Sequence, residues 1–106
     1  MKFYQFEIHE YMDMYPETIV HTFESVDDAK AYASHMNSSY SGGTTRFVKE
    51  LDAMQAYRYI HKNINSLFKD YSKYANSPNS IHHVSDKDII TYVETALRAL
   101  NECYPL

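Results

Sequence analysis

The sequence predicts an α+β fold with the element order ββαβαα, and three observations lead to this prediction. Residues 2–12 alternate between apolar and polar side chains, as a half-buried strand does. Residues 18–23 are rich in β-branched and aromatic side chains. Residues 52–75 carry a wide apolar stripe at helical spacing. We therefore expect a short antiparallel sheet packed against one long and two shorter helices.

The first two segments predict an N-terminal hairpin with a turn over residues 13–17. Its first strand has two faces, Tyr4, Phe6, Ile8 and Met12 on one and Gln5, Glu7, His9 and Tyr11 on the other. A turn centred on Tyr15 places His9 opposite His21, Tyr11 opposite Ile19, and Glu7 opposite Phe23. The turn position decides this register, because a slip of one residue moves every side chain to the other face.

A first helix is predicted after Ser25, which has the side chain of an N-cap residue. Asp27 and Asp28 occupy its first turn, where the helix dipole favours acids. Its apolar stripe consists of Ala29, Tyr32, Ala33 and Met36. The composition of residues 37–43 predicts a loop. Residues 44–50 are best explained as a third strand, with a ragged helix start as the alternative.

The long helix is expected to begin at Asp52, which with Gln55 has the spacing of a capping box. Its predicted apolar face contains Met54, Tyr57, Ile60, His61, Ile64, Leu67, Phe68, Tyr71, Tyr74 and Ala75. Tyr59 is the one large ring that falls outside this face. The segment 76–80 ends the helix.

The last helix is predicted to start after Ser85, with Asp88 completing a capping box and Pro105 ending the helix. Its apolar face contains Ile89, Val93, Ala96, Leu97, Leu100 and Tyr104.

Length and composition limit the class of protein. A chain of 106 residues that is 44% hydrophobic, with only two glycines, predicts one packed domain over residues 1–106. The lone Cys103 excludes an internal disulfide and a cysteine-rich zinc site. No apolar run reaches the roughly 18 residues of a membrane span, and residues 1–10 alternate where a signal peptide is apolar. We expect a soluble protein of a reducing, cytoplasmic compartment that binds no membrane.

Positive charge is concentrated in the middle of a chain whose net charge is −4. Arg58, Lys62, Lys69 and Lys73 share a narrow sector of the long helix. Such a stripe is suited to an acidic protein surface or to a phosphate backbone, and it also occurs as a plain solvated helix face. Four cations are few for a dedicated nucleic-acid binder, so protein binding is preferred and nucleic-acid binding is the alternative.

Catalytic, cofactor and metal motifs are weak. If the predicted register holds, His9, His21 and Glu7 lie close enough to hold a zinc or nickel ion, but a surface histidine pair without function is the preferred explanation. Residues 41–45 lack the Gly-Lys-Ser/Thr ending of a phosphate loop. Cys103 lies at a frayed helix end without a base to activate it. We therefore predict a protein that is not an enzyme and holds no cofactor and no metal.

Eleven tyrosines and no tryptophan are the most unusual feature of the composition. Tyrosine is enriched at protein interfaces, although a domain without tryptophan also uses it as its large core residue. Two surfaces are predicted to bind a partner. One is an outer hairpin face of Tyr11, Ile19, His21 and Phe23, and the other is the basic face of the long helix with Tyr59.

The sequence thus predicts a small non-catalytic interaction module whose partner is another protein or a second copy of itself. In general style this small, acidic, Tyr/Asn/Ser-rich composition resembles the inhibitors carried by bacteriophages and mobile elements, which bind one host enzyme and block it. The carboxylates are too sparse for a mimic of duplex DNA. An uncharacterised small enzyme or a metal-binding protein is the third interpretation.

Overall fold

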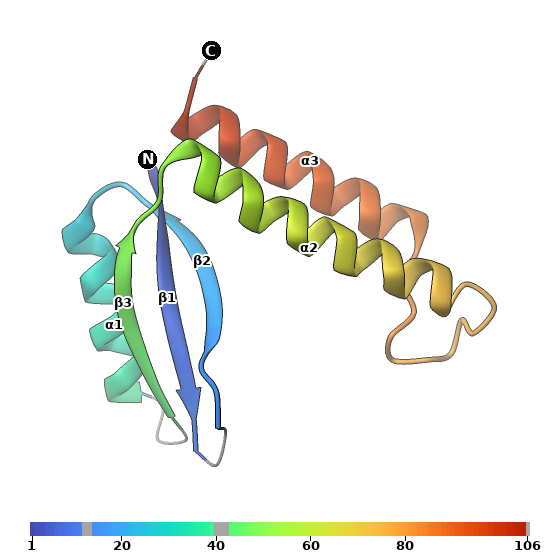
Figure 1. Cartoon of the computed structure of the whole chain (residues 1–106), viewed down its shortest axis with the longest axis horizontal. Helices are drawn as coiled ribbons and strands as arrows, with labels where there is room; N and C mark the ends of the chain where they lie inside the picture. The colour runs from blue at the N-terminus through green and yellow to red at the C-terminus, as the bar shows by residue number, and fades with distance from the viewer. Residues whose placement is uncertain (12–13, 40–42, 106) are drawn as a thin grey trace. The chain divides into compact units, whose positions relative to one another are not determined.

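The computed structural model describes residues 1–11, 14–39 and 43–105, and it confirms the predicted α+β fold and element order. The same six elements follow one another along the chain in Figure 1. They are β1 (Lys2–Glu10), β2 (Glu17–Phe23), α1 (Val26–Ser39), β3 (Gly43–Glu50), α2 (Ala53–Lys73) and α3 (Asp86–Cys103).

The contacts within the chain divide it into two compact units, Met1–Asp52 and Ala53–Leu106. The first unit contains the sheet and α1, and the second contains α2 and α3. A single cooperative domain over residues 1–106 stays a prediction.

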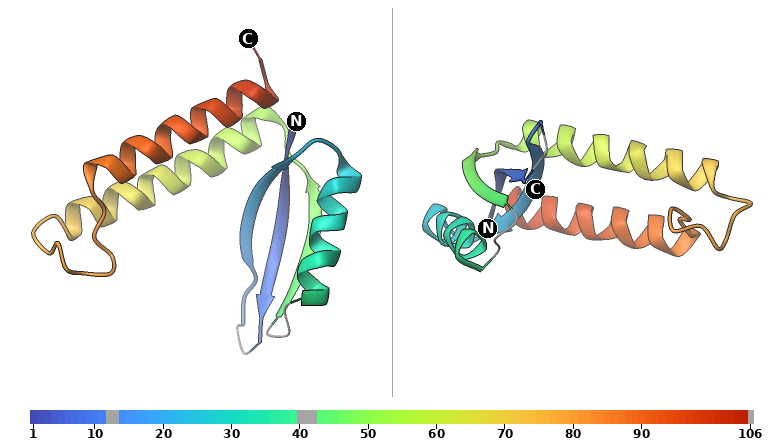
Figure 2. Two further views of the ribbon diagram at one scale, coloured as in Figure 1. Left: turned by 180° about the vertical axis from the view of Figure 1, so that it is seen from behind. Right: turned by 90° about the horizontal axis from the view of Figure 1, so that it is seen from below.

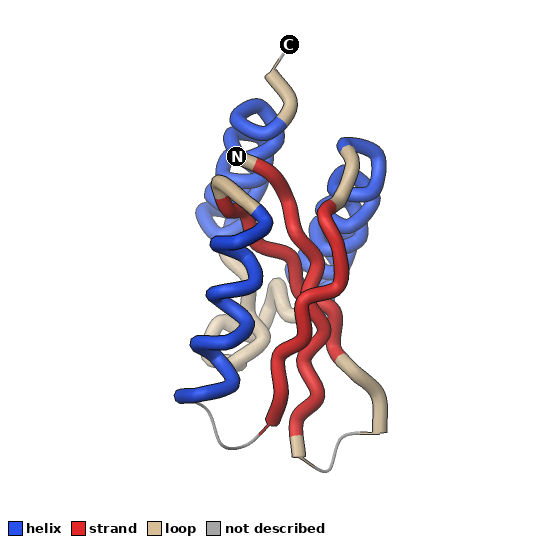
Figure 3. The backbone as a smooth tube through the Cα atoms, turned by 90° about the vertical axis from the view of Figure 1, so that its left-hand side faces the viewer, coloured by secondary structure: helices blue, strands red, loops and turns tan. Residues whose placement is uncertain are grey.

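The first unit is a three-stranded antiparallel sheet in the order β2-β1-β3 (Figure 3). β1 is the central strand, and its side chains alternate as predicted. Residues 44–50 form a strand and not a helix start, which decides the alternative that the sequence left open. The pairing of β1 with β3 shifts between Gln5 and Phe6, where the ladder is irregular.

The predicted hairpin register is wrong. Tyr4 pairs with His21, Phe6 with Ile19, and Lys2 with Phe23, a slip of five residues from the predicted pairing. Because five is odd, the slip moves the β2 side chains to the opposite face of the sheet. The observed register places the apolar side chains of both strands on one side, where they can be buried together, and the predicted one separated them.

The core of the first unit lies between the sheet and α1, which covers one face of the sheet (Figure 2). Tyr4 and Phe6 are almost fully buried against Ala29 and Ala33 of the helix. Side chains of the other strands complete this core, namely Ile19, Phe23, Tyr32 and Phe47. Small residues on α1 allow the helix backbone to approach the aromatic rings of β1 closely, as the predicted stripe implied.

The start of α1 agrees with its predicted cap, because the Asp28 backbone N–H donates to Ser25 Oγ over 3.2 Å. Its end does not agree, since the helix continues to Ser39 where a loop was predicted from residue 37. Asn37 explains the extension. Its side chain accepts from the Thr45 N–H at 2.6 Å and donates to the Thr45 carbonyl at 2.9 Å, so its polar groups are satisfied by β3.

Gly43 begins β3 at a point where two backbones come very close. A Cβ at this position would lie 2.4 Å from the His9 carbonyl oxygen of the neighbouring strand. Only glycine fits there without a shift of the backbone.

The second unit is an antiparallel helical hairpin in which α2 and α3 lie side by side (Figures 1 and 2). α2 begins at Ala53, directly after the predicted cap residue Asp52. Ser85 and Asp88 form the predicted capping box of α3, each side chain accepting the other residue's backbone N–H. The Ser85 backbone N–H donates a hydrogen bond to the Asp88 carboxylate, and this bond is the main reason that the pKa of Asp88 lies below its usual value.

Two hydrogen bonds fix the far end of the hairpin. Tyr71 of α2 donates its hydroxyl to Asp86 of α3 over 2.5 Å, which raises the pKa of the Tyr71 hydroxyl. In the connection between the helices, His83 Nδ1 lies 3.0 Å from the Tyr74 carbonyl oxygen. These contacts hold the start of α3 beside the end of α2.

Candidate interaction surface

The predicted cationic stripe is present on α2. Arg58, Lys62, Lys69 and Lys73 are all exposed, and the fifteen residue steps from Arg58 to Lys73 span about 22 Å of helix. Within the described part of the chain, none of the four forms an ion pair with a carboxylate. Lys73 Nζ lies 5.4 Å from the centre of the Tyr74 ring. The charge of this stripe is therefore directed to solvent.

An aromatic side chain lies at the edge of the stripe. Phe68 is 46% exposed, and it lines a shallow hollow with Asn65, Lys69, Ser72 and Lys73. The hollow combines one apolar ring, two cations, an amide and a hydroxyl. This mixture is suited to a partner side chain that has an apolar body and an acidic or polar end.

α2 is rotated about its axis relative to the prediction. Ala56 and Ile60 are its most buried residues, and Tyr59, which was expected outside the apolar face, is half-buried. Met54 and Tyr57 are more than half exposed although they were predicted to be in the core. The predicted apolar face was wider than one packing surface covers, so part of it stays open.

α3 also has apolar side chains that the packing of the unit leaves in solvent. Ile90 is 56% exposed and Leu97 is 61% exposed. A second hollow lies between the two helices, lined by Phe68 and Tyr71 from α2 and by Asp86, Ile89 and Ile90 from α3. Sequence reasoning placed Leu97 and Phe68 in the core and did not single out Ile90. The excess width of the predicted α2 apolar face is the signal that could have found Phe68, and no signal in the sequence singled out Leu97 or Ile90.

The second predicted surface, the outer hairpin face, is not formed. Ile19 and Phe23 pack against the core on the α1 side of the sheet, as the corrected register requires. Tyr11 is 82% exposed and lies beyond the end of β1. These residues do not form one exposed patch, and their role in partner binding stays a prediction.

His21 lies on the α1 side of the sheet among aromatic rings. Its ring centre is 5.2 Å from that of Tyr32 and 6.0 Å from that of Phe6. The Tyr32 hydroxyl and His21 Nε2 are 3.3 Å apart, within hydrogen-bond distance. Burial lowers the pKa of His21 below its usual value of 6.5.

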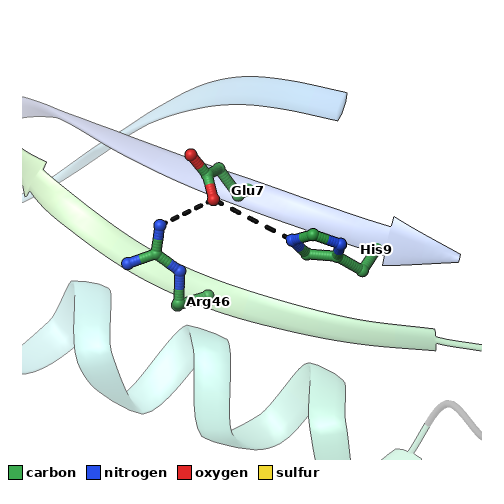
Figure 4. A network of polar contacts seen from close by, with 3 residues as sticks. All are labelled: Glu7, His9 and Arg46. Carbon is green, nitrogen blue, oxygen red and sulfur yellow. Dashed lines mark hydrogen bonds and ion pairs between the residues drawn. The ribbon is translucent and has the colours of Figure 1, made fainter. Parts of the chain in front are cut away.

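The residues that suggested a metal site are separated. His9 pairs with Thr44 of β3, whereas His21 pairs with Tyr4 and faces α1. Glu7 accepts from Arg46 over 2.6 Å and lies 4.0 Å from His9 Nε2 (Figure 4). Glu7 is therefore paired with an arginine of β3, and His21 lies away from both Glu7 and His9. Among the described residues, no three His, Cys, Asp or Glu side chains are arranged to hold a metal ion.

Comparison with known proteins gives no further information about this surface. No protein-family model, curated protein or solved structure matches the chain. In the part of the chain that the structure describes, no helix has both the length and the apolar character needed to cross a lipid bilayer.

Proposed function

We propose that this chain is a non-catalytic interaction module that binds an acidic surface of another protein through the exposed basic face of α2. The observation that supports the proposal best is the hollow beside Phe68. There, Lys69 and Lys73 flank an exposed aromatic ring. Exposed aromatic side chains with charged neighbours are typical anchors of protein interfaces, and the cations supply orientation and a faster association.

The rest of the stripe extends the same surface. Arg58 and Lys62 continue the line of positive charge along α2 toward the start of the helix. A partner with a row of carboxylates would therefore meet cations along several turns of one rigid element. Because the stripe is fully hydrated before binding, each pair adds modest affinity, and the aromatic anchor supplies the apolar contact.

The function that we propose for such binding is inhibition. The chain would bind one host protein in the cytoplasm and block it, as the inhibitors of bacteriophages and mobile elements do. The small size and the acidic, tyrosine-rich composition support this proposal.

The test is affinity capture from a lysate of the source organism, with and without nuclease, for the wild-type chain and two double variants. Lys69→Glu with Lys73→Glu reverses the charge beside Phe68, and Lys87→Glu with Arg98→Glu makes the same change on α3 as a matched control. We expect one stoichiometric protein that survives nuclease, is lost by the first variant and is retained by the control. Retention by both variants would contradict the proposal.

Nucleic-acid binding is the second candidate, and the unpaired line of four cations favours it. A phosphate backbone that contacts all four would give a slope of about −3.6 for log K against log salt concentration. Titration of a labelled duplex at several salt concentrations measures this slope. Lys69→Ala with Lys73→Ala should reduce it by about 2 if the stripe follows the backbone. A slope near zero would exclude this candidate.

A further inference from the structure

The hairpin of α2 and α3 has an apolar side that is separate from the cationic stripe. On α2, Tyr57, Ile64 and Phe68 recur at the spacing of a helix–helix seam, with His61 between the first two. On α3, Ile90, Val93 and Leu97 follow the same spacing. Four of these six side chains are 46–61% exposed, namely Tyr57, Phe68, Ile90 and Leu97. We call these six residues the hairpin face.

Both halves of the hairpin face lie on the same side of the unit. Phe68 and Ile90 line one hollow, so their side chains approach each other across the groove between the helices. The hydrogen bond between Tyr71 and Asp86 fixes the relative height of the two antiparallel helices. With an equal rise per residue, Leu97 comes to the height of Ile60, one residue from His61. The apolar surface therefore continues over both helices.

We propose that the hairpin face is covered by the hairpin face of a second copy of this chain, forming a four-helix bundle around a two-fold axis. A surface that binds a second copy of itself should not bring like charges together. The α2 half of the hairpin face meets this requirement, because it contains no carboxylate, lysine or arginine. Two such faces can meet without like charges in contact. Seams at this spacing on both helices are the pattern by which four-helix bundles are packed.

Charge determines how the two copies are oriented. α2 contains four cations and one acid, whereas α3 contains four acids and two cations. A bundle that places α2 against the partner's α2 would bring two positive helices together. A bundle that places α2 against α3 of the partner joins opposite charges twice, once on each side of the axis. We therefore assign the second arrangement.

The area of the hairpin face is large enough for a stable dimer interface. An 18-residue helix is about 27 Å long, and two adjacent helices are about 20 Å wide. The projected face is therefore roughly 540 Å², and the corrugation of the side chains raises the accessible area toward the roughly 800 Å² per partner of a stable interface.

The first experiment measures the oligomeric state of the full chain by sedimentation velocity at several concentrations. We expect a dimer for the wild type and a monomer for Leu97→Glu, whose side chain is mostly in solvent, so that the helix content by circular dichroism is unchanged. Thr95→Glu adds the same charge at an exposed site of α3 outside the hairpin face and should stay dimeric. A wild-type monomer at about 100 µM, or a dimeric Leu97→Glu, would overturn the proposal.

The second experiment tests the orientation with two single-cysteine chains on a Cys103→Ser background. One carries His61→Cys and the other carries Leu97→Cys, and the two are mixed and oxidised. A disulfide that joins one chain of each kind is expected for α2 against the partner's α3. Crosslinks only between chains that both carry His61→Cys would contradict the assigned arrangement.

The two proposals share Phe68, which anchors the acidic partner in one and belongs to the hairpin face in the other, but their tests change different side chains. The reversal of Lys69 and Lys73 tests capture of the acidic partner, and Leu97→Glu tests self-association. A chain that loses one property and keeps the other identifies which of the two proposals fails.

Discussion

At the scale of single residues, the pairing of β1 with β2 decided which face of the sheet each β2 side chain lies on, and residue type alone did not predict it. His21 and Phe23 were correctly predicted to share a face, but that face was assigned to solvent because the turn was centred on Tyr15. The observed pairing of Phe6 with Ile19 places both residues in the α1 core. A half-buried sheet specifies its register by burying the larger apolar set, and turn composition alone does not reveal it.

The environment of His21 leads to a pH prediction. The pKa of His21 is lower in the folded chain than its unfolded value of 6.5, so folding favours the neutral imidazole. The stability that neutral His21 contributes is fully present above pH 6.5, and it is lost as the pH falls through the folded-state pKa. We expect the free energy of unfolding of the wild type to fall as the pH drops below 6.5, and that of His21→Asn to fall less. Urea unfolding at a series of pH values measures the difference.

The control for this experiment is His82→Asn, which changes an exposed loop histidine and leaves His21 in place. It should keep the wild-type pH profile. Identical profiles for His21→Asn and the wild type would show that protonation of His21 is not linked to folding.

At the scale of elements, the helix starts were predicted well, and the end of α1 was not. Ser25 and Ser85 are N-cap residues as expected, because a capping side chain bonds to backbone groups within its own helix turn. The end of α1 depends on Asn37, whose partner Thr45 belongs to β3. A bond between separate elements leaves no local pattern, so the composition of residues 37–43 predicted a loop.

The Asn37 side chain therefore connects α1 to β3, and its removal should be costly. Asn37→Ala leaves the backbone N–H and carbonyl of the buried Thr45 without their Asn37 partner, and we expect a loss of about 1–3 kcal/mol in the free energy of unfolding. Asn101→Ala on the exposed side of α3 is the matched control and should change stability by less than about 0.5 kcal/mol. Chemical denaturation measures both, and equal losses would remove the special role of Asn37.

At the scale of the whole molecule, the packing of α2 decides which of its apolar side chains are buried and which stay exposed for binding. The basic stripe was located from the sequence because charged side chains at helical spacing are exposed in almost any packing. Which part of a wide apolar face stays open depends on the neighbouring elements. Tyr57 and Phe68 were predicted to be buried for this reason, and Ile90 was not singled out.

The second unit has few deeply buried side chains, namely Ala56, Ile60 and Ile89 among its described residues. If a second copy covers the hairpin face, the stability of the second unit must depend on protein concentration. We expect hydrogen-exchange protection of amides in α2 and α3 to be higher at about 100 µM than at about 1 µM, and protection in β1 to be unchanged. Mass spectrometry of the exchanged chain measures both regions in one experiment. Equal protection of α2 and α3 at the two concentrations would contradict coverage by a copy.

The sequence by itself determined the α+β class, the order of the elements, the caps of α1 and α3, and the cationic stripe. Each of these depends on residues within a few positions of one another, where periodicity and hydrogen bonding are local. Only the tertiary structure decided the hairpin register, the bond from Asn37 to β3, and the rotation of α2 that exposes the hairpin face. These features depend on which distant apolar surfaces exclude water together, and that competition involves the whole chain at once.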